Sequence, residues 1–222
     1  METFVDIITR YRQAFLSGLR VTVELALIIW CSGVLFGSVI GIFAAKFKKA
    51  IGIPARMCSF VLSGIPVLAY LFWAHYPMQA ILGTVINPFY TAAVVLSTIN
   101  IFAVSDLIGS QLLDFPEQYN VAAKVCGLSA RTTILKIQLP IILRQVIPAL
   151  LPLQVIMLQS TLFASLISVE EIFRVAQRVN SVEYKPVHIY TALALLFLLV
   201  CLPVNGFAIW LRRRFTRNIS ET

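Results

Sequence analysis

The sequence is poor in charge for its length. Of its 222 residues, 13% are charged and only 10 are acidic, whereas a soluble domain usually carries about 25% charged residues. Hydrophobic residues make up 59% of the chain. This shortage of charge excludes a disordered chain, a fibrous repeat and an ordinary soluble enzyme. It indicates a protein whose solvent is partly lipid.

Motifs for nucleotide binding and for hydrolytic chemistry are also missing. No glycine precedes a lysine, so the chain has no Gly-Lys-Ser/Thr phosphate loop. It also lacks Gly-x-Ser-x-Gly, His-Glu-x-x-His and paired-carboxylate motifs, so we expect no catalytic residue. The four cysteines have no metal-ligand spacing, and we expect no metal site. The energy source must be an ion gradient or a separate subunit.

Long runs without Lys, Arg, Asp or Glu locate the lipid segments. The runs cover residues 25–45, 57–105, 145–169 and 186–211. The second run has 49 residues, more than twice the roughly 20 that one membrane helix needs, and it contains the turn signal Asn87-Pro88. We therefore divide it into two helices. The sequence predicts an all-α membrane protein with five transmembrane helices, at about 20–45, 56–83, 89–113, 138–168 and 186–211.

The basic residues predict the direction of insertion. A cleaved signal peptide fits the first segment poorly, because lysines and not a small-residue cleavage site follow it. With the amino end outside, the inner segments hold 12 Lys and Arg and the outer segments hold 6. This bias predicts an outer amino terminus and a basic cytoplasmic tail over residues 212–222. We read the net charge of +8 as this orientation signal, and not as a nucleic-acid surface.

Two outer segments are expected to lie at the membrane surface. Residues 1–18 place apolar side chains at helical spacing, which predicts an amphipathic helix. Residues 170–185 are rich in charges of both signs. Either segment is a candidate contact for an external partner, and a plain interfacial anchor is the alternative for the first.

The inner loop over residues 114–140 is the one stretch that resembles a soluble protein. Pro116 and Glu117 form a helix-start signal, Gly127 is a stop, and Ser129 is a cap for a second helix. A helix of about three turns is too short to be stable alone in water, so it must dock against something. It is either a membrane-surface helix or a docking helix for a cytoplasmic partner.

The predicted spans contain several polar side chains. Asp106 is either a functional carboxylate or a tie to a neighbouring helix, because charge inside a membrane is costly. The fourth span has Pro148 and Pro152, followed by a polar series. These residues either hydrogen-bond between helices or line a polar path. The candidates for the path are Asn100, Asp106, Gln154, Gln159, Ser160, Thr161 and Ser165.

The inner loop resembles that of a known family. The segment from Val121-Ala-Ala to Gly127, followed by Leu139-Pro140, is similar to the cytoplasmic loop of permease subunits of ABC importers, whose pattern is Glu-Ala-Ala, three residues, Gly, then Leu-Pro. Stretches such as Gly64-Ile-Pro66 and residues 165–171 are similar to the polar amino-acid branch. Val121 stands where that family has Glu, Gly109 stands in place of an Arg, and Gln159-Ser160 replace Lys-Asp.

The resemblance implies a type I importer permease fold, in which residues 19–211 form a five-helix transmembrane domain with a cytoplasmic coupling helix in the loop 114–140. The residues that it assigns to the contact with the ATPase are Glu117, Val121, Ala122, Ala123, Gly127, Leu139 and Pro140.

The resemblance also implies a set of partners. They are ATP-hydrolysing subunits, a second permease that is the same or a sister chain, an external substrate-binding protein and membrane lipid, with no nucleic acid. ATP would be bound by a partner and no cofactor by this chain. The chain would lie in the bacterial inner membrane and form the path for a polar amino acid. The alternative is a gradient-driven transporter or channel that works without an ATPase.

Overall fold

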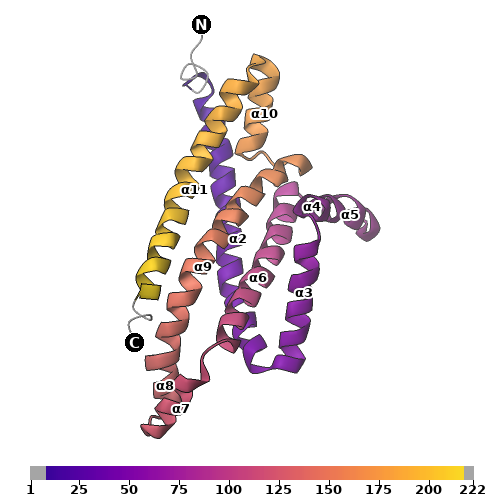
Figure 1. Ribbon diagram of the computed structural model, residues 1–222. Coiled ribbons are helices and arrows are strands. Elements are labelled where there is room, and N and C mark those ends of the chain that lie inside the picture. Colours follow the sequence, from indigo (N-terminus) through magenta and orange to yellow (C-terminus); the bar gives the residue numbers. More distant parts are fainter. Residues whose placement is uncertain (1–8, 218–222) are drawn as a thin grey trace.

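The computed structural model describes residues 9–217, and this part of the chain consists of helices and their connections (Figure 1). Its helices in chain order are α2 (Arg12–Lys46), the π-turn η1 (Lys48–Gly52), α3 (Ile53–Gly64), α4 (Val67–His75), α5 (Pro77–Leu82), α6 (Pro88–Leu113), α7 (Glu117–Val125), α8 (Ala130–Thr133), the π-turn η2 (Ile134–Gln138), α9 (Leu139–Ser160), the 3₁₀ helix η3 (Thr161–Ile167), α10 (Ile172–Glu183) and α11 (Pro186–Arg217).

Four segments are long and apolar enough to cross a membrane. They are Arg12–Lys46, Pro88–Leu113, Ala130–Ile167 and Pro186–Phe215, and they agree with four of the five predicted spans. Part of the predicted surface segment 1–18 belongs to the first of these, because α2 is one helix from Arg12 onward. Residues 1–8 of this segment lie outside the described residues, as do residues 218–222 at the end of the basic tail.

The second predicted span is not a single helix, so the expectation of a continuous helix over 56–83 is wrong. Segments Lys48–Gly64 and Val67–Leu82 meet at 97°, and α4 and α5 turn sideways from the bundle (Figure 1). The cause is Pro66, which lacks an N–H and pushes the preceding Ile65 into an extended conformation, with φ −92° and ψ 125°. The pair is either one broken span or a re-entrant segment.

Among the described helices, α2 and α6 make the most extensive contact. Gly33, Gly37 and Gly41 repeat every four residues on one face of α2, and all three are buried. A Cβ atom at Gly37 would lie 2.7 Å from the carbonyl oxygen of Ile101 on α6. Small residues at this spacing let two helix backbones approach in lipid. The glycines therefore fix the distance at which α6 holds its polar side chains.

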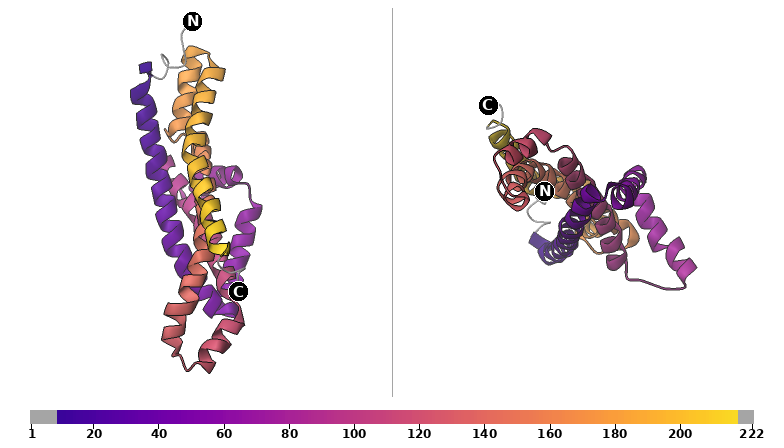
Figure 2. Two further views of the ribbon diagram at one scale, coloured as in Figure 1. Left: turned by 60° about the vertical axis from the view of Figure 1, so that its left-hand side comes forward. Right: turned by 90° about the horizontal axis from the view of Figure 1, so that it is seen from below.

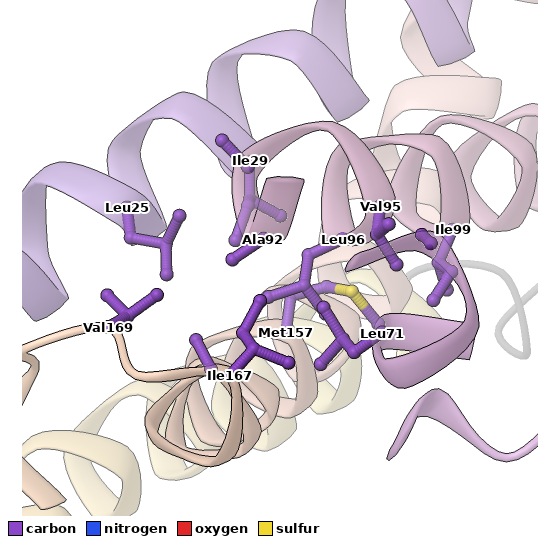
Figure 3. Close-up of a cluster of buried hydrophobic side chains, with 13 residues drawn as sticks. Leu25, Ile29, Leu71, Ala92, Val95, Leu96, Ile99, Met157, Ile167 and Val169 are labelled. Carbon is purple, nitrogen blue, oxygen red and sulfur yellow. The ribbon is translucent and has the colours of Figure 1, made fainter. Parts of the chain in front are cut away.

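The main apolar core lies where α2, α6, α4, α9 and η3 meet. Leu25, Ile29, Leu71, Leu96 and Ile167 are all fully buried there. Figure 3 shows Leu25 and Ile29 of α2 facing Ala92 and Leu96 of α6. By contrast, only 17% of the apolar stretch of α11 is buried, which leaves an apolar surface for lipid or another helix.

The two ends of the bundle carry different structures. The described amino-terminal part and α10 lie at one end, whereas α7 and α8 project from the opposite end (Figure 1, Figure 2). The carboxyl end of α11 is directed toward the α7 end. The two ends of the bundle therefore present different surfaces.

Candidate functional site: the projecting helix and the polar residues of the spans

Helix α7 is present where the loop sequence predicted a helix. It runs from Glu117 to Val125 and has an acidic residue in its first turn and Lys124 in its last turn, which matches the helix dipole. Gly127 then adopts φ 70°, a left-handed conformation that favours glycine. Its N–H donates to the carbonyl of Lys124, and the N–H of Leu128 donates to that of Ala123. The predicted glycine corner is therefore also present.

The chain returns from this corner to the fourth span without a flexible break. The side chain of Ser129 accepts a hydrogen bond from the N–H of Thr132, as the capping prediction required. Helix α8 continues through the π-turn η2 into Leu139 and Pro140 at the start of α9. Helix α7 is therefore joined to α6 by a short connection and to the continuous helical segment Ala130–Ile167 by the corner at Gly127.

One face of α7 packs on the chain and the other is exposed. Ala123 is buried, whereas Val121 is 53% exposed. Glu117, Ala122 and Gly127 are exposed as well, so four of the seven predicted coupling residues lie exposed on this projection. Leu139 is exposed and Pro140 is half-buried, and both lie at the base of this projection. Such a surface suits the groove of a partner protein.

An amide pair, which the sequence analysis missed, fastens α7 to the foot of the fourth span. Nε2 of Gln138 donates to Oδ1 of Asn120 at 2.7 Å. The two residues also line a polar cavity of about 310 Å³, together with Lys48 and Glu117. Nothing in the sequence marks two amides that are 18 positions apart as partners. This hydrogen bond links α7 to the residue that immediately precedes α9.

Asp106 has a partner on a neighbouring helix. Its Oδ1 lies 3.7 Å from Nε of Arg56, and both side chains are partly exposed. The pair joins α6 to α3 near the end that carries α7. The sequence left two roles open for Asp106, a functional carboxylate or a link to a neighbouring helix. The contact with Arg56 is a link of the second kind.

Asn100 and Gln154 are brought together in the interior. Asn100 is fully buried, and its Nδ2 donates to Oε1 of Gln154 at 3.0 Å and to the carbonyl of Ile29 at 2.9 Å. Nε2 of Gln154 donates in return to Oδ1 of Asn100, and Trp30 donates to the backbone carbonyl of Gln154. These hydrogen bonds connect α2, α6 and α9 at one level. The two side-chain amides are therefore partners of each other.

The remaining candidates of the fourth span do not join this pair. The hydroxyls of Ser160, Thr161 and Ser165 are buried and donate to carbonyls of their own helical segment, those of Ile156, Leu158 and Leu162. Gln159 is exposed on the surface of α9. The candidate path residues are therefore spread over several sites and not gathered in one cavity.

Glu171 at the opposite end is a buried carboxylate that the sequence analysis did not select. It caps α10 by accepting hydrogen bonds from the N–H groups of Phe173 and Arg174. The N–H of Ile172, the residue directly after Glu171, donates to the hydroxyl of Thr22 on α2. Burial disfavours the charged carboxylate and raises the pKa of Glu171 to about 7, although the two backbone donors oppose this.

The charged outer segment 170–185 forms α10, an amphipathic helix. Its charges are largely paired within the chain: Glu170 lies 3.0 Å from Arg178, and Glu183 lies 3.2 Å from Arg10. Tyr11 also donates to Glu183. The segment predicted as a possible partner contact is therefore an ordered structure fastened to the beginning of α2.

Comparison with known proteins connects these features. Residues 37–217 match the family model described as "Binding-protein-dependent transport system inner membrane component". The chain is 25% identical over 218 residues to the octopine transport system permease protein OccM of Rhizobium meliloti, covering 92% of this chain and 89% of that protein. It is also 25% identical to the histidine/lysine/arginine/ornithine transport system permease protein HisM of Salmonella typhimurium, over 98% of this chain and 99% of that protein. The identity to the glutamine transport system permease protein GlnP of Escherichia coli is 27%, over 84% of this chain and 88% of that protein.

Solved structures share the fold. An amino acid ABC transporter crystallised with histidines superimposes with a TM-score of 0.84 at 23% identity, over 96% of this chain and 99% of that one. The inward-facing MetNI methionine ABC transporter gives a TM-score of 0.67 at 15% identity, over 93% and 98%.

Proposed function

This chain belongs to the family of binding-protein-dependent transport system inner membrane components, and on this premise we propose how its parts serve the import of an amino acid. It is a transmembrane subunit of an ATP-driven amino-acid importer, and it is not itself an enzyme, because ATP is hydrolysed on a separate chain. Family membership favours this function over a gradient-driven transporter without an ATPase.

In this proposal α7 is the helix that contacts the ATPase. The observation that carries the proposal is a short helix with an exposed face that projects from one end of the bundle and is joined firmly to two membrane-crossing segments. ATP binding closes the pair of ATPase subunits and moves α7 as a lever. Because the bond between Asn120 and Gln138 joins α7 to α9, the inner ends of the third and fourth spans move with it.

The end of the molecule that carries α7 is cytoplasmic, which puts the amino terminus outside and the basic carboxyl tail inside. The greater number of Lys and Arg in the inner segments supports this orientation. The outer end, with α10 and the beginning of α2, then faces the substrate-binding protein. A second permease, a copy or a sister chain, completes the path.

The substrate is a polar amino acid, as the names of the octopine, histidine and glutamine relatives suggest. Asn100 and Gln154 supply its polar contacts when the helices part and the hydrogen bonds between the two amide groups break. We also assign Asp106, Gln159, Ser160, Thr161 and Ser165 to this path, as separate contacts along it and not as one binding cavity.

Reconstitution tests the proposal. The chain is placed in vesicles with and without its ATPase subunits, its partner permease and its binding protein, and uptake of a labelled amino acid is measured. We expect uptake only with ATP and the ATPase chain present. Uptake by this chain alone, without nucleotide, would reject the proposed function.

A pair of proline variants tests the role of α7 as a lever. Gly127→Pro removes an N–H that donates to Lys124 and forbids the positive φ of the corner. Gly83→Pro makes the same change in an outer turn, where φ is 62° and the N–H donates to Ala80. We expect Gly127→Pro to abolish transport while the protein still inserts, and Gly83→Pro to retain it. Equal activity of the two variants would contradict the lever.

A further inference from the structure

A cavity of about 250 Å³ opens beside Asp106 at the end of the bundle that carries α7. It lies between the end of α2, the π-turn η1, the beginning of α3 and the lower half of α6. Its lining residues that matter for the argument are Lys48, Ile53, Arg56, Met57, Asp106 and Ser110. Of these residues, the transport mechanism proposed above uses only Asp106.

The cavity carries a surplus of positive charge. Nε of Arg56 lies 3.7 Å from Asp106, which is longer than a hydrogen bond, and the Arg56 side chain is 63% exposed. Lys48 is exposed on η1 and forms no ion pair within residues 9–217. Two cations and one carboxylate thus line the cavity, and most of the Arg56 side chain is accessible to a ligand.

The walls of the cavity are apolar. Ala44 and Ala55 are buried at its back, while Ile53 and Met57 are more than half exposed at its edge. Ser105 and Ser110 add hydroxyl groups on α6. A cationic mouth above apolar walls matches an amphipathic anion, and it does not match a small hydrophilic ion, which would gain nothing from the walls.

The backbone that presents the two cations is held firmly. Lys48 begins a π-turn, a rare element that often occurs at functional sites. At the end of this turn a Cβ atom on Gly52 would lie 2.7 Å from the carbonyl oxygen of Ala44, so the turn packs directly on α2. Arg56 follows in the first turns of α3. The spacing of Lys48 and Arg56 is therefore set by backbone packing.

We propose that this cavity binds an anionic phospholipid of the inner leaflet. The phosphate lies between Lys48 and Arg56, the hydroxyl of Ser110 contacts the headgroup, and the upper part of an acyl chain covers Ile53 and Met57. Basic pockets between membrane helices on the cytoplasmic side are suited to such headgroups. The assignment to the inner leaflet rests on the orientation given under Proposed function, whereas binding itself does not.

Native mass spectrometry of the purified full chain in detergent tests the site. The chain is titrated with phosphatidylglycerol and with phosphatidylcholine of the same acyl chains, and bound lipids are counted. We expect preferential binding of phosphatidylglycerol. Lys48→Gln with Arg56→Gln should weaken it about 30-fold, since each cation near a lipid surface contributes about 1 kcal/mol.

Two kinds of variant separate this cavity from general surface charge. Lys136→Gln with Arg144→Gln removes two exposed cations near the same end without touching the cavity, and should leave phosphatidylglycerol binding unchanged. Asp106→Asn removes the opposing carboxylate and should strengthen binding about fivefold. Ser110→Leu fills space without changing charge and should weaken it.

Three outcomes would overturn the proposal: equal loss in both double variants, no gain in Asp106→Asn, or displacement of the lipid by millimolar inorganic phosphate. The last would make the occupant a free anion. Because the measurement needs neither ATP nor a partner chain, its failure leaves the proposed transport function untouched, and a failure of transport leaves lipid binding untouched.

Discussion

The close packing of α2 on α6 makes a sharp prediction for Gly37→Ala. In an ordinary helix, replacing Gly by Ala stabilises by about 0.5–1 kcal/mol. At Gly37 the added Cβ would lie 2.7 Å from the carbonyl oxygen of Ile101 and 2.7 Å from Cβ of Val104. Carbon atoms in contact prefer about 3.5–4.0 Å, so the methyl group overlaps α6 by about 1 Å.

Gly206→Ala on α11 is the matched control, because nothing lies within 4 Å of the Cβ that it adds. Both substitutions bring the same helical gain, so the difference between the two variants isolates the packing cost. Overpacking of this kind costs about 1–3 kcal/mol. We therefore expect Gly37→Ala to unfold more easily than Gly206→Ala by that amount.

Unfolding of the purified chain by SDS in mixed micelles, followed by tryptophan fluorescence, measures this difference. The midpoint for Gly206→Ala should be equal to or above that of the natural chain, and the midpoint for Gly37→Ala should be below it. Equal midpoints for the two variants would refute the close approach of the α2 and α6 backbones.

Two further predictions concern buried polar groups. The pKa of Glu171 is about 7 in the folded chain and 4.5 ordinarily, so the folded state keeps a proton that the unfolded state releases between these pH values. The free energy of unfolding should therefore fall by about 3 kcal/mol as the pH rises from about 4.5 to 7. In Glu171→Gln, the free energy of unfolding should no longer fall with pH across this range. An unchanged dependence on pH would show that another group causes it. Asn100→Leu and Gln154→Leu should each destabilise by about 1–3 kcal/mol, since each leaves a buried amide unpaired, and the double variant should lose less than the sum in the same unfolding assay. Additive losses would mean that the two amides do not interact.

The sequence predicted the spans well because lipid imposes a strong and local signal. The third span was expected at 89–113 and is Pro88–Leu113, and the last was expected at 186–211 within Pro186–Arg217. The helix at Glu117 and the corner at Gly127 were likewise predictable, since caps and left-handed glycines act within a few residues.

The break in the second span was missed although its signal was present. The length of the run over 57–105 and the turn signal Asn87-Pro88 divide it into two helices, but the effect of Pro66 on Ile65 was not applied. The repeat of Gly33, Gly37 and Gly41 was also visible in the sequence and was not read as a helix interface.

The polar contacts could not be predicted, because they depend on how helices far apart in the sequence rotate against one another. Asn100 and Gln154 are 54 positions apart, and Arg56 reaches Asp106 only because α3 turns back along α6. The sequence identified three of these four residues as polar candidates and could not pair them. Arg56 was counted only as an orientation charge.

The contact between α7 and an ATPase subunit is the claim on which the account depends most, and cross-linking tests it directly. Val121→Cys is placed in a background whose four native cysteines are replaced by serine, with Val182→Cys on α10, 63% exposed at the opposite end, as the control. In membranes that contain the whole importer, a thiol cross-linker should join the cysteine at position 121, and not that at position 182, to the ATPase chain. The account is contradicted if the cysteine at position 121 gives no adduct with the ATPase and instead reacts with an impermeant maleimide added outside intact cells.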